Sequence, residues 1–127
     1  MTNQTQNIAV ITGGSRGLGR NTAESLARKG VASVITYHSK AEDARAVVAT
    51  IKAKGANAIA LQLDSAATKT FDTFAEQLKK TLQDTWGAKR FDYLVNNAGI
   101  SHHNSFEKTT EAELDSLYNA NFKGVFF

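Results

Sequence analysis

The chain has 127 residues, 42% of them hydrophobic and 21% charged, with a formal net charge of +3; this length and composition suit one folded domain. The 15 Lys and Arg residues are spread among 12 Asp and Glu residues, so we favour a mixed-charge surface and expect no nucleic-acid partner. The absence of cysteine excludes disulfides, thiolate nucleophiles and zinc–thiolate sites.

The first residues of the chain carry no targeting signal. After Met1, residues 2–7 are polar and uncharged in their side chains, and residues 1–7 lack the basic and apolar regions of a signal peptide. No apolar run approaches the roughly 20 residues that span a bilayer. We therefore expect a cytoplasmic protein with no membrane partner.

Strand-like and helix-like segments alternate along the chain. Short β-rich runs predict strands at residues 8–12, 31–37, 58–63 and 91–95. Apolar residues at helical spacing predict a helix after each of the first three strands, with stop signals at Lys29-Gly30, Lys54-Gly55 and Trp86-Gly87. The alternation predicts an α/β fold, a doubly wound parallel sheet of the Rossmann type with strand order 3-2-1-4 in the part seen.

A fourth helix is predicted after residue 110. Thr110 and Glu113 have the spacing of a capping box, in which each side chain bonds the other residue's backbone N–H. The residues that follow at helical spacing form one stripe, which we expect to face the sheet. Its members are Leu114, Leu117, Tyr118, Asn121 and Val125.

Residues 12–19, Thr-Gly-Gly-Ser-Arg-Gly-Leu-Gly, join the first strand to the first helix, the position of a dinucleotide-binding loop. Gly13 lets the chain leave the strand in a tight turn. Gly17 has no Cβ, so backbone N–H groups can approach a pyrophosphate, and Gly19 lets the helix pack closely. The helix N-terminus adds free N–H donors and a positive dipole end.

A P-loop is the main rival explanation of these glycines. Gly14 and Gly19 have its separation, but Arg20 and Asn21 stand where it needs Lys and Ser or Thr. Residues 12–19 instead resemble the T-G-x-x-x-G-x-G loop of short-chain dehydrogenases/reductases, and the resemblance extends over the whole chain. It implies cofactor contacts by Gly13, Ser15, Arg16, Gly17, Leu18 and Gly19.

The end of the second strand bears on the choice of cofactor. Domains that prefer NAD usually place Asp or Glu there, to bind the ribose 2′-OH. Here Tyr37 occupies that place, and no carboxylate follows before Glu42. Arg16 can reach the same space, with His38 and Ser39 nearby, and its planar fork suits a phosphate. We therefore expect NADP, with NAD less favoured; the alternative is that Arg16 only forms a surface ion pair.

Two further motifs follow strands three and four. The resemblance implies that Asp64 accepts a hydrogen bond from the adenine amino group and that the Ser65 backbone donates to the ring; alternatively, Asp64 only caps the next turn. Residues 96–99 resemble the family's N-N-A-G motif. There it steadies the sheet and lines the adenosine ribose, which implies contacts by Asn97, Ala98 and Gly99.

Asn121 is the candidate catalytic residue. Its place in an apolar stripe predicts a buried amide, which must be hydrogen-bonded, and the simple explanation is a bond to a neighbouring carbonyl. Asn121-Phe122-Lys123-Gly124 also resembles the family's N-x-x-G helix motif, in which the Asn anchors a water of the proton relay. We favour the second interpretation.

The other catalytic residues of that family would be a Ser and a Tyr-x-x-x-Lys pair. None of Tyr37, Tyr93 and Tyr118 is followed by Lys four residues later, and no Ser follows a fifth strand. The resemblance implies hydride transfer between NADPH and a carbonyl or alcohol substrate, possible only for a longer parent protein; a 3-oxoacyl carrier-protein reductase is one candidate. The alternatives are an inactive nucleotide-binding module and a self-associating fragment.

The end of the chain supports a longer protein. The fourth helix runs to Phe126 and Phe127 without a polar cap, whereas domains rarely end on exposed aromatic residues. We expect residues 1–127 to be the N-terminal portion of an NAD(P)-binding Rossmann domain, and the protein to be a homo-oligomer. The alternative is a complete chain whose aromatic residues are buried against a second copy.

His102 and His103 are the remaining candidates for chemistry. Adjacent histidines rarely point at one ion, and no carboxylate is spaced to help them, so we expect no metal site. Their place after residues 96–99 favours the mouth of the substrate site or an ordinary loop.

Overall fold

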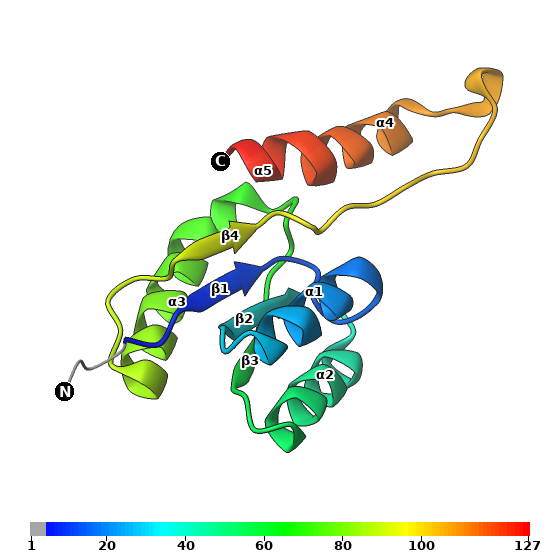
Figure 1. The fold of residues 1–127 in the computed structure, drawn as a ribbon. Helices are drawn as coiled ribbons and strands as arrows, with labels where there is room; N and C mark the ends of the chain where they lie inside the picture. The colour runs from blue at the N-terminus through cyan, green and yellow to red at the C-terminus, as the bar shows by residue number, and fades with distance from the viewer. Residues whose placement is uncertain (1–4) are drawn as a thin grey trace.

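The computed structural model describes residues 5–127 and contains one four-stranded parallel sheet in the order β3-β2-β1-β4 (Figure 1). The strands are β1 (Ile8–Ile11), β2 (Ala32–Tyr37), β3 (Ala58–Gln62) and β4 (Tyr93–Val95). In the register, Ile8 pairs with Ala32 and Ala9 pairs with Tyr93. The α/β class and the strand order predicted from the sequence are confirmed.

The predicted strands run slightly too long. Thr12, Val31, Leu63 and residues 91–92 lie just outside β1, β2, β3 and β4. Apolar and β-branched residues continue past the hydrogen-bonded ladder because the turns beside the sheet are also packed. Composition alone therefore does not distinguish a strand residue from a packed turn residue.

Helices follow the strands as predicted. They are α1 (Gly17–Arg28), α2 (Ala41–Ala53), α3 (Phe71–Trp86) and α4 (Glu111–Tyr118), with two short 3-10 turns, η1 (Thr68–Thr70) and η2 (Phe106–Lys108). A π-helical turn, η3 (Asn119–Lys123), continues α4 into the last short helix, α5 (Gly124–Phe126). Gly30, Gly55 and Gly87 have φ between 61° and 84°, the left-handed conformation expected where a helix ends.

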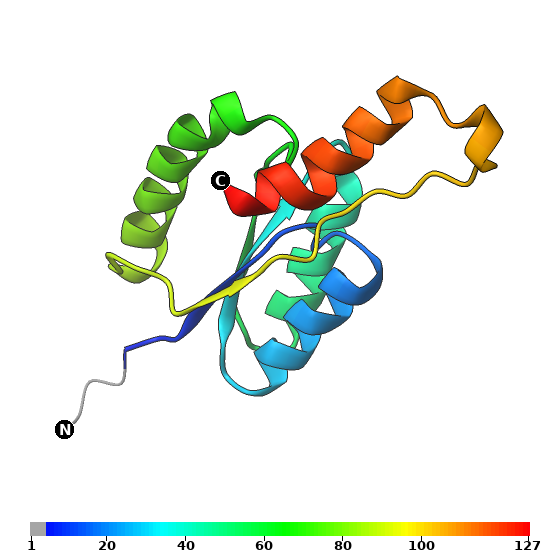
Figure 2. The ribbon, with the colours of Figure 1, turned by 90° about the horizontal axis from the view of Figure 1, so that it is seen from above.

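The helices form two layers, one on each face of the sheet (Figure 2). On one face, Ala23 of α1 and Val47 and Ile51 of α2 pack on alternate residues of the strands such as Ile11. On the other face, Leu78 and Leu82 of α3 are buried against the remaining alternate residues. Because successive side chains of a strand point to opposite faces, strands buried on both sides read as continuous apolar runs.

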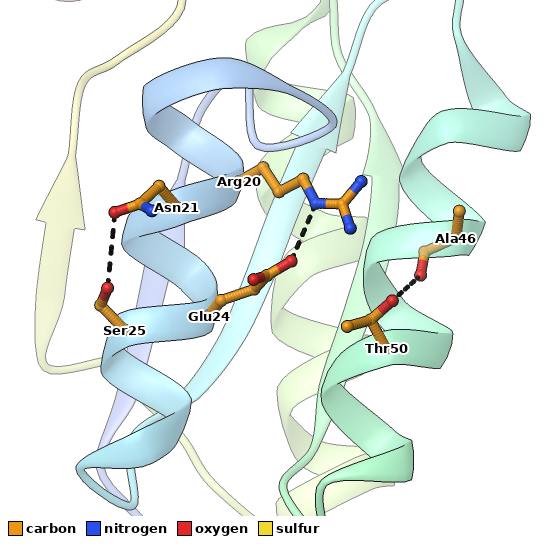
Figure 3. A network of polar contacts seen from close by, with 6 residues as sticks. All are labelled: Arg20, Asn21, Glu24, Ser25, Ala46 and Thr50. Carbon is orange, nitrogen blue, oxygen red and sulfur yellow. Dashed lines mark hydrogen bonds and ion pairs between the residues drawn. The ribbon is translucent and has the colours of Figure 1, made fainter.

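Helices α1 and α2 lie side by side, and Figure 3 shows polar contacts on both. In α1, Arg20 Nε donates to Glu24 Oε1 at 2.8 Å, and Ser25 Oγ donates to Asn21 Oδ1 at 3.5 Å. In α2, Thr50 Oγ1 donates to the Ala46 carbonyl at 2.9 Å. The Arg20 guanidinium holds the pKa of Glu24 below its usual range. These contacts stay within their own helices, while apolar side chains join the helices to the sheet.

The stripe of the fourth helix is where the prediction is wrong. Leu114, Tyr118 and Val125 are 60%, 53% and 44% exposed, and Asn121 is exposed as well. Both ribbon views show α4 and the loop before it projecting away from the sheet (Figures 1 and 2). The helix therefore touches the rest of the molecule mainly near α5, and only Ala120 of its central turn is buried. Helical spacing predicts an apolar face but not which surface covers it.

Candidate functional site

A cleft opens at the carboxyl ends of β1, β2 and β3. Its volume is about 460 Å³. In a parallel α/β sheet this edge is where ligands bind, because the strands end there and the following loops diverge. Thirteen of the predicted site residues line it: Gly13, Ser15, Arg16, Gly17, Leu18, Tyr37, His38, Ser39, Asp64, Ser65, Asn97, Ala98 and Gly99. Gly19 and Asn121 are not among its lining residues.

The glycine loop adopts the tight turn that its sequence predicts. Gly13 has φ +67°, and a Cβ on it would lie 2.9 Å from the Ala98 Cα. A Cβ on Gly19 would lie 2.3 Å from the Gly13 carbonyl oxygen, so this glycine lets α1 pack against the turn. Gly17 has φ +57°, and within residues 5–127 no atom beyond its chain neighbours and its own helix backbone lies within 4 Å of its Cβ position, which leaves open space beside the start of the helix. Each glycine is required for a different reason.

The N-terminus of α1 faces this open space and has no capping side chain among residues 5–127. Its N-cap residue, Arg16, makes no side-chain capping bond, and the first turn contains no acidic residue. The first N–H groups of a helix have no intrahelical acceptor and carry the positive end of the helix dipole. Together with the Gly17 opening, they form a cradle that fits a pyrophosphate.

A set of hydrogen bonds ties the glycine loop to the segment after β4. Asn97 Nδ2 donates to the carbonyls of Thr12 and Gly13 at 3.1 and 3.0 Å. Thr12 Oγ1 accepts from the backbone N–H groups of Asn97 and Ala98 at 3.1 and 3.0 Å. These bonds join residues 84 to 86 positions apart in the chain. The Asn97 side chain therefore holds the floor of the cleft together.

Sequence reasoning missed the polar role of two threonines. Besides Thr12, the buried Thr36 of β2 supports the loop from the other side: its Oγ1 accepts from the Gly13 N–H at 3.3 Å, and its carbonyl accepts from the Gly14 N–H at 3.0 Å. A threonine in a buried strand is usually a β-branched filler. Thr12 offered a local signal, because it stands directly before the glycine loop in the sequence, whereas nothing in the sequence around Thr36 marks its role.

The end of β2 supplies a cationic part of the cleft. Its cations are Lys40, which follows Tyr37 in the chain, and Arg16, which lines the same cleft from the glycine loop. Tyr37, the last residue of β2, is half-buried against the α1–α2 face of the sheet and also lines the cleft, and its side chain has no carboxylate. The arrangement leaves space and positive charge where an NAD-preferring site would hold Asp or Glu.

Asp64, the acidic residue of the cleft lining, follows β3. Its Oδ1 accepts from the Ala66 N–H at 2.9 Å, which is the turn cap considered in the sequence analysis. Its Oδ2 lies 3.6 Å from Nε2 of His38, which follows the neighbouring strand β2. The carboxylate therefore does both things: it caps its own turn, and it borders the cleft beside Ser65.

Asn121 lies outside the cleft lining and clamps the segment that follows Gly99. Its Oδ1 accepts from the Ile100 N–H at 2.9 Å, and its Nδ2 donates to the Ile100 carbonyl at 2.9 Å. The bond to a neighbouring carbonyl, the simple explanation, is thus present, although the side chain is exposed rather than buried. Asn121 sits inside the π-helical turn, a feature that often marks functional positions in helices.

Gly124 brings the same helix against the cleft. A Cβ on Gly124 would lie 1.7 Å from the Ser65 carbonyl oxygen, so no other residue fits at this close approach. The contact and the Asn121–Ile100 bonds place the buried Ala120 in the cleft wall. The N-x-x-G spacing therefore has a geometric explanation: Asn121 holds the loop after β4, and Gly124 packs on the turn after β3.

The loop between β4 and α4 is tied to the start of α4. Thr110 and Glu113 make both bonds of the predicted capping box. The Thr110 backbone N–H holds the pKa of Glu113 below its usual range, and the Asn104 amide, 3.4 Å from both carboxylate oxygens, lowers it further. His102 and His103 lie exposed on this loop.

Comparisons with known proteins agree with this geometry. A family model described as short chain dehydrogenase matches residues 7–127. A 3-oxoacyl-[acyl-carrier-protein] reductase of Staphylococcus aureus, FabG, is 39% identical over 121 residues, which cover 93% of this chain and 46% of that protein. The chain thus spans about half the length of such relatives.

The solved structures with a similar fold include two that contain NADP. A short-chain dehydrogenase from Burkholderia cenocepacia J2315, in complex with NADP, superposes with a TM-score of 0.83 at 39% identity, over 98% of this chain and 49% of that one. The landomycin C-6 ketoreductase LanV, with bound NADP and rabelomycin, gives a TM-score of 0.91 at 33% identity, over 98% and 51% of the two chains. In the range 5–127, no helix is long and apolar enough to cross a membrane.

Proposed function

The chain belongs to the short-chain dehydrogenase family, and from that premise we propose that residues 1–127 form the cofactor-binding portion of an NADPH-dependent oxidoreductase. When bound, NADPH supplies a hydride for reducing a carbonyl, or NADP accepts one from an alcohol. The observation that carries the proposal is the cleft itself: a glycine loop, a free helix N-terminus and an Arg meet at the carboxyl edge of a parallel sheet.

Different residues of the cleft bind different parts of the cofactor in this proposal. The loop at Gly13 and Gly17 and the first turn of α1 hold the pyrophosphate through backbone N–H groups. Asp64 and the Ser65 backbone receive the adenine, and the segment held by Asn97 lines the adenosine ribose. Among the predicted contacts, Gly19 acts from outside the cleft by letting α1 pack against the loop.

Arg16 selects NADPH over NADH in this proposal. A guanidinium presents several N–H donors in a planar fork that matches a phosphate, and Tyr37 removes the repulsion that a carboxylate would cause. We expect Arg16→Ala to weaken NADPH binding about 10- to 100-fold, as for a hydrogen bond to a charged group, and to leave NADH binding unchanged. Arg20→Ala is the matched control, because Arg20 pairs with Glu24 on α1 and does not line the cleft.

Asn121 acts by holding the backbone that follows Gly99. Its amide ties Ile100, a residue of the cleft wall, to the helix that carries Ala120. The position of a polar clamp beside the cofactor cleft supports a role in the proton relay, as in the family motif that Asn121-Phe122-Lys123-Gly124 resembles. Residues 1–127 contain no Tyr-x-x-x-Lys pair, so the proposed chemistry is that of the whole protein.

The experiment that tests the proposal measures binding and turnover separately in the full-length protein. Fluorescence titration should give tighter binding of NADPH than of NADH, and carbonyl compounds should then be screened for NADPH oxidation. 3-Oxoacyl thioesters come first, because a relative is a 3-oxoacyl-[acyl-carrier-protein] reductase. Binding without turnover of any carbonyl or alcohol would support a regulatory nucleotide-binding module instead, and absence of binding would refute the proposal.

We also propose that the protein is a homo-oligomer. Tyr118, Phe122 and Phe126 stack along one side of the last helix with ring centroids 5.5 and 6.5 Å apart, and they are 53%, 60% and 74% exposed. Exposed apolar patches of this kind usually mark protein contacts. Light scattering after size exclusion of the full-length protein should give a multiple of the mass of one chain, and Phe122→Glu should lower the measured mass. A monomeric wild type would refute the proposed homo-oligomer.

A further inference from the structure

We propose that the amino edge of the sheet, where its strands begin, docks an acidic segment of a partner protein in a groove between the ends of α1 and α2. The groove has a volume of about 250 Å³ and lies beside the starts of β1, β2 and β3, at the edge opposite the cofactor cleft. Gln6, Lys54 and Asn57 supply its polar side chains, and none of the lining residues within the range 5–127 is acidic.

The fold gathers at this edge cations that are scattered along the sequence. Because the strands are parallel, the segments that precede them meet at one edge of the sheet. The Ser33 N–H, for example, donates to the Asn57 carbonyl at 3.2 Å and so joins the segment before β3 to the start of β2. Four cations, here called the edge cations, lie at the helix ends that lead into β2 and β3: Arg28, Lys29, Lys52 and Lys54.

The edge cations are exposed, and none of them forms an ion pair in the part of the chain that the structure describes. Glu24 of α1 is already bonded to Arg20 at 2.8 Å (Figure 3). The Arg20 bond foremost, and then the charges of Lys54 and Arg28, hold the pKa of Glu24 below its usual range. Asp92, which precedes β4 at the same edge, accepts from the first backbone N–H of β1 at 2.8 Å. The edge around the groove therefore keeps an excess of positive charge.

The helix dipoles explain only part of this pattern. Arg28 and Lys52 lie in the last turns of α1 and α2, where a cation stabilises the negative end of a helix. That effect is local to each helix and leaves the exposed charges available to a ligand. It does not account for a groove that places the Lys54 and Asn57 side chains together between the two helix ends.

The size and chemistry of the groove favour a carboxylate side chain as its occupant. An ammonium group and two side-chain amides donate hydrogen bonds to a carboxylate, which accepts several. The groove is smaller than the roughly 300–1,000 Å³ of small-molecule sites, so it fits a side chain better than a nucleotide. Single-stranded nucleic acid binds to aromatic platforms, and the groove lining within residues 5–127 has no aromatic residue. A segment with several Asp or Glu residues can place one in the groove and others beside the edge cations.

The test uses the full-length protein and a fluorescein-labelled decapeptide of alternating Glu and Gly. Fluorescence anisotropy should show binding that weakens as salt is added, and the matching Gln–Gly peptide should not bind. We expect Lys29→Glu combined with Lys54→Glu to weaken binding about tenfold or more, because each exposed charge contact contributes about twofold to fivefold and is here reversed. Lys29→Gln combined with Lys54→Gln should weaken it less and serves if the reversed variant does not fold. Asn57→Asp keeps the shape of the groove and should weaken binding about fivefold.

Lys69→Glu combined with Lys79→Glu is the matched control, because it makes the same change of net charge at exposed residues outside the groove lining, and it should bind the peptide as wild type does. The inference is overturned if the Glu–Gly peptide does not bind, or if the two double Glu variants weaken its binding equally. Tighter binding of oligothymidylate or of phosphatidylserine vesicles than of the peptide would also overturn it, in favour of nucleic acid or a membrane. NADPH titration of the same samples tests the proposed function independently, and its result should be the same with and without the peptide.

Discussion

Asn97 offers a stringent test of how the cleft is held together. Its amide donates two hydrogen bonds, to the Thr12 and Gly13 carbonyls, and the side chain is partly buried. Asn97→Asp keeps the shape of the side chain but replaces the donor by a carboxylate oxygen. That oxygen would face two carbonyl oxygens at about the same distances, so the change converts attraction into repulsion.

The magnitude follows from the number of bonds. Each hydrogen bond contributes about 0.5–1.5 kcal/mol net, so Asn97→Ala should lower the free energy of unfolding by about 1–3 kcal/mol. Asn97→Asp should cost more, roughly 3–4 kcal/mol, because the partly buried charge is left without a donor. Affinity for NADPH should fall in both variants, since the Thr12 and Gly13 carbonyls lose their hydrogen bonds to the segment after β4.

Urea denaturation measures the effect, with the midpoint converted to free energy by the slope of the transition. Asn96→Asp is the matched control: Asn96 is exposed, and its side chain makes no hydrogen bond within residues 5–127, so this variant should change stability by less than about 0.5 kcal/mol. The reasoning is refuted if Asn97→Asp is as stable as wild type, or if Asn96→Asp and Asn97→Asp destabilise equally.

Three further predictions concern other parts of the chain. Gly124→Ala should lower the unfolding free energy by about 2 kcal/mol or more in thermal melts and should weaken NADPH binding, because the added Cβ would collide with the Ser65 carbonyl. A variant with the melting temperature of wild type would contradict the close approach. Ser33→Ala should raise the unfolding free energy by about 1 kcal/mol in urea titrations, since the Ser33 hydroxyl is buried without a hydrogen-bond partner within residues 5–127. A loss of stability would show that the hydroxyl makes a favourable contact in the folded protein. NMR titration should find the pKa of Glu113 below that of a Glu in the unfolded chain, and the pKa in Asn104→Ala should be closer to the unfolded value. Because the folded pKa is lowered, the stabilisation that Glu113 supplies is present above the ordinary Glu range and is lost as the pH falls through the lowered pKa. An ordinary pKa in wild type would contradict the capping geometry.

Much of the site could be predicted because its chemistry is local. The glycines at 13 and 17 sit where the backbone needs positive φ, and the capping box joins residues three apart, so short-range sequence patterns report both. The missing carboxylate at Tyr37 is also a local fact. Residues that act through distant partners were harder to find: Thr36 supports a glycine 23 positions away, and nothing in its neighbourhood distinguishes it from a filler of the sheet.

The fourth helix shows the limit most clearly. Its start at Thr110 was predicted correctly, since a cap depends on a few neighbouring residues. The burial of its stripe was predicted wrongly, since burial depends on which other element lies against that face, and Tyr118 remains 53% exposed. The same stripe contains Asn121, whose partner, Ile100, is 21 residues away.

The sequence by itself determined the order of strands and helices, the turns at the glycines and the lack of a carboxylate after β2, because these depend on backbone preferences and on spacings of a few residues. The tertiary structure alone decided that Asn97 reaches the Thr12 carbonyl across 85 positions and that His38 stands 3.6 Å from Asp64. Such contacts arise only when the register of the sheet and the packing of its helices bring separate strand ends to one edge. A local sequence pattern does not contain this long-range arrangement.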